Sequence, residues 1–247
     1  MTPDAIIAAL ALPDDSRIDQ RVPKKHLLEH GATTAADRRR IQDGIDKLRW
    51  VAALKPNTVG VPQYHDDDRD YLEIAVLTLF ARPDAKSSRV EELIHRAVPH
   101  PTILVARRGD EVVVSLAHKR RSRSEAEATV LDGPLIAGTI VAADRPILDG
   151  LAVARQPRDH LMALYHGWVE WIEALRASRV TGRFARPPSP EAAEARRRAL
   201  ERRENLQREV AGLRSRATRE TQLSRRVNLN LTIRRLEAEL AEAIGDL

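Results

Sequence analysis

The alternation of hydrophobic and polar positions predicts a helical start to the chain. Residues 3–11 (PDAIIAALA) have the apolar spacing of a short amphipathic helix, and Thr2 can cap it. Residues 21–31 predict a short extended piece that runs into a helix ending at the glycine of position 31. Across residues 34–54, apolar side chains recur at intervals of four, three and four, which predicts one amphipathic helix (Ile41, Ile45, Leu48 and Ala52).

The middle of the chain changes to the pattern of strands. Residues 71–81 form an apolar run that predicts a buried strand, and residues 87–99 predict a helix. Two β-rich runs flank the turn sequence at 108–110, which is typical of a tight hairpin, and a further strand over 127–131 could pair beside it. We therefore expect an α+β fold, in which a small, mainly antiparallel β-α-β-β-β sheet is covered by helices.

The C-terminal third predicts helices only. A long helix over 157–178 places Trp168 and Trp171 on one apolar face, where we expect both in the core. Three prolines among residues 187–190 mark a boundary. We therefore predict an α+β head over residues 1–182, a Pro-rich linker over 183–190 and a coiled-coil arm over 191–247.

Two apolar series in the arm predict an assembly seam. They step by four, three and four, but a break separates them near residues 216–224 because the second series is out of heptad phase with the first. We favour an antiparallel helical hairpin; one long kinked helix is the alternative, and either could pair with a second copy of the chain. Asn230, inside the seam, is expected to fix its register. The seam residues are Leu206, Val210, Leu213, Leu229, Asn230, Ile233, Leu236 and Leu240.

Composition limits the chemistry that is open to this chain. Of its 247 residues, none is cysteine, which excludes disulfides, thiol catalysis and Cys-based zinc or iron–sulfur sites. Aromatic residues make up only 3%, which argues against a base-stacking platform. The net charge of +5 permits contact with nucleic acid without requiring it. No window has the charge order of a signal peptide or the length of a membrane span, so we expect a soluble, cytoplasmic protein that does not contact membranes.

An acidic loop over residues 65–73 suggests one enzymatic function. Its four aspartates and one glutamate could hold Mg²⁺, and a metal-dependent nuclease would use Asp70 or Glu73 with Glu111 and Lys119 on neighbouring strands. The compact Asp…Glu-x-Lys pattern of restriction-type nucleases is missing, and a solvated loop that protects a sheet edge is the alternative interpretation. Outside this nuclease hypothesis we predict neither a metal nor a cofactor.

A basic run at the end of the second hairpin strand suggests phosphate binding. Closely spaced cations can grip a nucleic-acid backbone without reading its sequence, and a charged strand end is the alternative. His95, His100 and His118 could cluster nearby, with His95 expected to be a hydrogen-bonded, partly buried histidine. The predicted phosphate-binding residues are Lys119, Arg120, Arg121 and Arg123, with Lys24 and Lys25 from the N-terminal region.

Short segments in a fixed order give the chain a resemblance to a known family. They are RVPKK at 21–25, IDKLRW at 45–50, LKPNT at 54–58, YLEI at 71–74, IH at 94–95, VPHP at 98–101 and LAHKR at 116–120, followed in the tail by Glu220, Gln222, Arg226, Val227, Asn230 and Ile233. With this set the chain resembles the bacterial and archaeal proteins of domain of unknown function (DUF) family 4391. His100 departs from the pattern, since a tyrosine is expected there.

The resemblance implies a setting rather than a mechanism. The family has no established activity. Its members resemble the products of accessory genes that lie beside helicase and DNA methyltransferase genes in restriction-like or antiphage islands. We therefore expect a non-enzymatic accessory subunit that binds a helicase or DNA methyltransferase of the same operon, with DNA as a further candidate partner. The metal-dependent nuclease is the alternative.

Overall fold

The structure, a computed structural model, describes residues 1–83, 85, 87–123 and 128–247. The chain divides into two compact units, residues 1–172 and residues 173–247. The division falls within one helix, ahead of the Pro-rich segment in which the sequence places its boundary. That residues 1–182 form an independent head stays a prediction.

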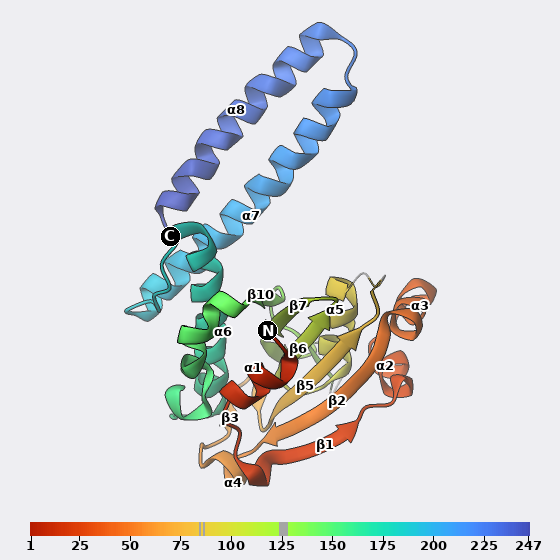
Figure 1. Ribbon diagram of the computed structural model, residues 1–247, viewed down its shortest axis with the longest axis vertical. Coiled ribbons are helices and arrows are strands. Elements are labelled where there is room, and N and C mark those ends of the chain that lie inside the picture. The colour runs from red at the N-terminus through yellow and green to blue at the C-terminus, as the bar shows by residue number, and fades with distance from the viewer. Residues whose placement is uncertain (84, 86, 124–127) are drawn as a thin grey trace. The chain divides into compact units, whose positions relative to one another are not determined.

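A six-stranded sheet organises the first unit (Figure 1). Its order is β1-β2-β5-β6-β7-β10, and within it only β5 and β6 run parallel, since every other neighbouring pair is antiparallel. The chain is therefore of mixed α and β structure with a mostly antiparallel sheet. The strands are β1 (Arg17–Arg21), β2 (Ile45–Leu54), β5 (Ile74–Ala81), β6 (Thr102–Arg108), β7 (Glu111–Leu116) and β10 (Ile136–Ile140).

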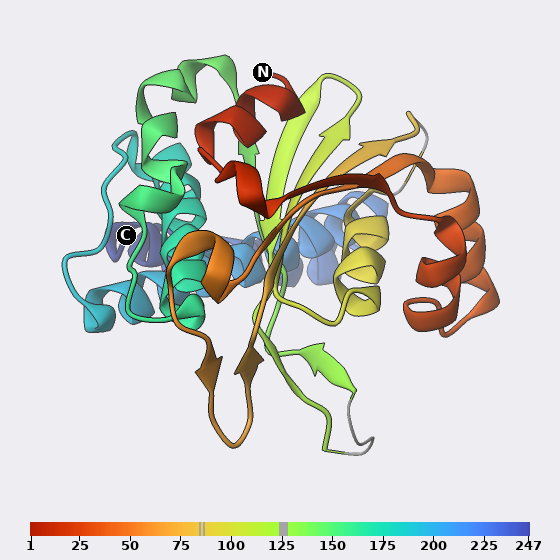
Figure 2. The ribbon, with the colours of Figure 1, turned by 90° about the horizontal axis from the view of Figure 1, so that it is seen from below.

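The two faces of this sheet carry different helices (Figure 2). Alternate side chains of a strand point to opposite faces, so Ala75, Leu77 and Leu79 of β5 share one face. They pack in one apolar core with Leu27 and Ile41. These two residues come from α2 (Lys24–His30) and α3 (Ala35–Gly44), and α5 (Ser87–Ala97) covers the same face.

Other helices cover the opposite face, where α1 (Pro3–Ala9) contacts β6. Helix α6 (Leu161–Thr181) begins in the first unit, where the Tyr165 hydroxyl donates to the Thr102 carbonyl at 2.8 Å. Trp168 and Trp171 are buried, as the sequence predicts. Short helices complete the unit: α4 (Pro56–Val59) and the 3₁₀ helices η1 (Asp14–Ser16), η2 (Ala142–Leu151) and η3 (Val153–Arg155).

The prediction of one helix over residues 34–54 is wrong in its second half. Helix α3 ends at Gly44, and residues 45–54 form β2, which pairs with β1 on one side and β5 on the other. The apolar residues of β2 satisfy the helical spacing by coincidence. Pairing with two distant strands overrides the local pattern there.

The sequence predicts the hairpin around residues 108–110 better than it predicts β2. Strands β6 and β7 meet at Gly109, whose φ of 60° is the left-handed conformation that favours glycine. The expected strand over 127–131 exists as β9 (Thr129–Leu131), with residue 127 outside the described part of the chain. Strand β9 does not join the main sheet; it pairs with β8 (Lys119–Arg121) in a separate two-stranded sheet, and β10, which the sequence analysis missed, takes the place beside β7.

The second unit contains two long helices, α7 (Pro190–Arg219) and α8 (Leu223–Gly245), which run side by side in opposite directions (Figure 1). Apolar residues from both form one cluster: Leu206, Val210, Ala217, Ile233, Leu236 and Ala243, with Leu213, Leu229 and Leu240 partly buried against it. Asn230 is exposed, so its predicted place in the seam is wrong. Among the helices of the described residues, none is long and apolar enough to cross a membrane.

Candidate functional site

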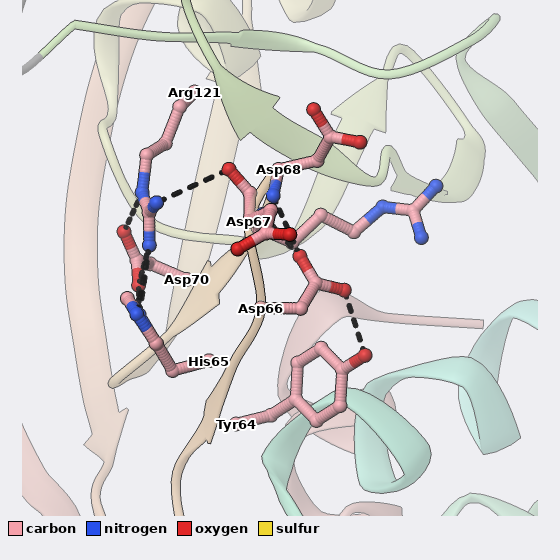
Figure 3. Close-up of polar contacts among 8 residues, drawn as sticks. Tyr64, His65, Asp66, Asp67, Asp68, Asp70 and Arg121 are labelled. Atoms are coloured by element: carbon pink, nitrogen blue, oxygen red, sulfur yellow. Dashed lines mark hydrogen bonds and ion pairs between the residues drawn. The ribbon is translucent and has the colours of Figure 1, made fainter.

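The acidic loop is a tight turn between two short strands, β3 (Tyr64–His65) and β4 (Asp70–Tyr71) (Figure 3). One carboxylate, that of Asp66, organises the turn. It accepts from the Tyr64 hydroxyl at 2.7 Å and from the backbone N–H groups of Asp68 and Arg69 at 2.9 and 2.6 Å. These hydrogen bonds lower the pKa of Asp66, the largest effect coming from Tyr64.

A second carboxylate of the loop, that of Asp70, pairs with an arginine of β8. Arg121 donates from Nε and Nη2 to the two oxygens of Asp70 at 2.6 and 2.9 Å, and His65 contacts the same carboxylate. Arg121 thereby lowers the pKa of Asp70 to about 2. In the same region, Arg69 donates to Asp132 at 2.9 and 2.6 Å. The loop is therefore held to the β8–β9 sheet by paired charges of opposite sign.

The structure does not assemble the residues of the nuclease hypothesis. Glu73 lies just before β5 and pairs with Lys55 at 3.1 Å, whereas Glu111 begins β7 opposite Arg108, at the far end of β6. The first residues of β5 pair with the first residues of β6, so Glu111 lies about six strand residues away, roughly 20 Å from Glu73. Glu73 and Glu111 thus lie at opposite ends of the main sheet, Asp70 and Lys119 belong to two separate two-stranded sheets, and Asp70 is already bound by Arg121.

Lys119 lies in the interior rather than on a basic surface. Its side chain is 2% exposed, and its ammonium donates to the carbonyls of His95 and Val98 at the C-terminal end of α5. Desolvation lowers its pKa from 10.5 to about 7. Lys119 therefore caps the carboxyl end of α5, which is a structural role, and the prediction that it contacts phosphate does not fit this burial.

The other predicted phosphate-binding cations differ in whether they already have a polar partner. Arg121 is paired with Asp70, and Arg120 lies 4.0 Å from Asp132. Arg123 is exposed. In the N-terminal region, Lys24 donates to the Gln42 carbonyl at 2.7 Å, and the exposed Lys25 lies 3.8 Å from Glu29.

The three histidines expected near one another have separate partners. His95 is fully buried and shares a hydrogen bond with the Ser115 hydroxyl at 3.0 Å, as expected for a structural histidine, and burial lowers its pKa to about 3. His118 shares one with the Tyr71 hydroxyl at 2.6 Å. His100 instead lines a groove, and burial lowers its pKa although Glu73 acts in the opposite direction.

That groove is where most of the short segments of the family resemblance meet. It has a volume of about 620 Å³ and lies between β1, α2, the ends of β2 and β5, and the carboxyl end of α5. Five of the segments contribute to its lining, although they span about 80 positions of the chain. The contributing side chains include Arg21, Pro23, Trp50, Lys55, Glu73, Pro99 and His100. Sequence reasoning named the segments without seeing that they share one surface.

A cluster of cations adjoins the groove. Arg21 lines the groove and also a neighbouring hollow with Lys24. The pKa of Lys24 is lowered, first by desolvation and next by the positive charge of Arg82. Arg39, Arg40 and Arg82 line a further hollow of about 530 Å³. We call Arg21, Lys24, Arg39 and Arg82 the basic cluster; of these, the sequence analysis named only Lys24.

Helix α8 carries two apolar faces rather than one. Its inner face packs against α7 through Ile233 and Leu236. A second series at positions 223, 227 and 231 is left exposed: Leu223 is 65%, Val227 47% and Leu231 58% accessible. We call these three residues the outer stripe. Residues four apart lie on one helix face, so the outer stripe is continuous.

Comparison with known proteins gives one match. A family model described as "Domain of unknown function (DUF4391)" matches residues 10–240. No curated protein and no solved structure matches the chain.

Proposed function

Because the chain belongs to the DUF4391 family, whose description names no activity, we propose a function from its own surfaces: it is a non-enzymatic accessory subunit of a helicase- or methyltransferase-linked, restriction-like or antiphage system. It binds its partner protein through the second unit, where α7 and α8 form a coiled-coil hairpin. It contacts a nucleic-acid backbone through the first unit.

The outer stripe is the observation that carries this proposal. Three large apolar side chains about half or more exposed on one helix face favour burial against another surface. Arg225, Arg226 and Arg234 on the same helix are also exposed, so the partner surface is expected to be apolar and flanked by acidic side chains. The stripe includes Val227, one of the tail residues that carry the family resemblance.

Co-purification with a matched pair of variants tests the partner. The chain is expressed in its own host in three forms. They are the wild type, a stripe variant that combines Leu223→Ser, Val227→Ser and Leu231→Ser, and a control that combines Gln207→Ser and Arg208→Ser at exposed positions of α7. We expect wild type and control to retain a helicase or DNA methyltransferase that the stripe variant releases. Retention by all three overturns the proposal, and so does a wild-type dimer that the stripe variant turns into a monomer without partner loss.

The basic cluster supports the nucleic-acid contact. Lys24 lies near Arg21 and Arg82, and although Asp46 and Asp43 offset part of this positive charge, an anion that binds among the three cations would be stabilised by them. Arg120 and Arg121, by contrast, already lie against carboxylates. We therefore assign backbone binding to the basic cluster and a minor contribution to residues 120–123.

Salt dependence on duplex DNA compares the two regions. Replacing Arg21, Lys24, Arg39 and Arg82 by Ala is expected to weaken binding on all sequences and to lower the log–log salt slope by about 0.9 for each phosphate contact removed. The control set, Arg120→Ala, Arg121→Ala and Arg123→Ala, is expected to change the slope less. An unchanged slope in the first set overturns this assignment. Cleavage of plasmid DNA with Mg²⁺ that is lost in Asp70→Asn or Glu73→Gln would favour the nuclease instead.

A further inference from the structure

Helix α2 presents three metal-ligand side chains at the edge of the groove. Its sequence, KKHLLEH, places His26 and His30 four residues apart with Glu29 between them. One ligand atom from each of the three lies within 4.8 Å of the others. Two histidines at this spacing on one helix face are a recurring zinc-binding arrangement.

The backbone that carries these side chains is fixed by packing. Leu27, between the two histidines, is 1% exposed and belongs to the core under the sheet. At the end of α2, Gly31 lies so close to α5 that a Cβ there would stand 2.6 Å from the Leu93 carbonyl oxygen. The histidine backbone positions are thus set before any ion binds, which lowers the cost of ordering the site.

The side chains themselves are available to a ligand. His26, Glu29 and His30 are all exposed, and the one polar partner that the described contacts give them is Lys25, 3.8 Å from Glu29. Ligand atoms around a tetrahedral zinc ion lie about 3.3 Å apart, from metal–ligand bonds of about 2.0–2.1 Å. Exposed side chains reach that spacing by rotation about their own bonds.

We propose that His26, Glu29 and His30 bind a divalent transition-metal ion, zinc in the first instance. Two imidazoles and one carboxylate suit Zn²⁺, Co²⁺ or Ni²⁺ better than Mg²⁺, which prefers an all-oxygen shell. His26 and His30 both line the groove, so the ion would lie at its edge. The ion would add a positive centre to a groove that Trp50, Lys55 and His100 also line, and an anionic group in the groove could bind it. This site stands whether or not the chain binds nucleic acid or a partner.

Titration with the metal alone tests the site. The full chain is purified without a polyhistidine tag, and Zn²⁺ binding is measured by calorimetry while Co²⁺ binding is followed by its visible absorption. We expect one ion per chain with tetrahedral Co²⁺ bands, and at least about tenfold weaker binding in His26→Gln and in His30→Gln, since each removes a ligand. Glu29→Gln should also weaken binding.

A matched control separates this site from Zn²⁺ binding at other exposed histidines. His65→Gln removes another exposed histidine of the first unit and is expected to bind Zn²⁺ as wild type does. The substituted positions are exposed, so all variants should keep the wild-type circular dichroism and melting temperature. Binding that is unchanged in His26→Gln/His30→Gln, that falls equally in His65→Gln, or that does not saturate at one ion per chain overturns the proposal.

Discussion

The segment over residues 119–121 and the outer stripe of α8 reverse the usual relation between residue type and exposure. A run of cations at a strand end predicts a phosphate-binding surface. Lys119 is instead buried against the end of α5, and Arg121 forms an ion pair with Asp70. Leu223 and Leu231 read as ordinary helix residues, yet both are more than half exposed.

The difference teaches which groups on this molecule still have an interaction to make. A charge that is already paired gains little from a new partner, because the existing pair must first be broken. An exposed apolar side chain gains about 25 cal/mol for each Å² that is removed from water. Binding functions are therefore better sought in the outer stripe, the basic cluster and the groove than in the charged segments that stand out in the sequence.

The largest expected effect separates the two faces of α8. Ile233→Asp places a carboxylate in the cluster shared with α7, and is expected to cost several kcal/mol in the free energy of unfolding of the second unit. Val227→Asp makes the same chemical change on the outer stripe and should shift stability by less than about 0.5 kcal/mol. Urea unfolding of the full chain, followed by circular dichroism, measures both. Similar losses in the two variants would show that the outer stripe is packed in solution.

A smaller effect, spread over a pH range, tests the burial of Lys119. Its pKa is lowered to about 7 in the fold against 10.5 in the unfolded chain, so between these values the unfolded state binds more protons. Stability should then rise with pH, by at most about 1.4 kcal/mol per pH unit from this group. In Lys119→Met this part of the rise is absent. Unfolding at pH 7, 8, 9 and 10 measures the difference between the two proteins, and a difference that does not change with pH would place Lys119 in contact with water.

The parts of the fold that the sequence predicts are those set by neighbours along the chain. The turn at Gly109 needs a residue that tolerates positive φ between two β-rich runs, and both signals lie within a few positions. Strand β2 was misassigned because its partners β1 and β5 are far from it in sequence, and its own apolar spacing fits a helix equally well. The break that separates α7 from α8 was visible because the two apolar series are out of phase.

The candidate sites divide in the same way. His26 and His30 could be recognised from their spacing alone, since a helix places residues four apart on one face. Arg121 and Asp70 are 51 positions apart, and the sequence around either residue does not predict that they pair. Convergence of the family segments on one groove likewise depends on the order of strands in the sheet, which the sequence analysis did not obtain.

The smallest expected effect concerns the paired charges of the acidic loop. Asp70→Asn keeps the size of the side chain and removes the charge that Arg121 and His65 contact, and we expect a loss of about 1 kcal/mol because the pair is partly exposed. The pKa of Asp70 is lowered from 3.8 to about 2, so its contribution to stability is complete above about pH 4 and is lost as the pH falls through 2. Wild type and variant should therefore differ at pH 6 and converge near pH 2. Two results together would contradict this: equal stability of wild type and variant at pH 6, and weaker binding of duplex DNA by Arg121→Ala than by wild type. Arg121 would then be free to bind phosphate, and residues 119–121 would be a binding surface, as the outer stripe is.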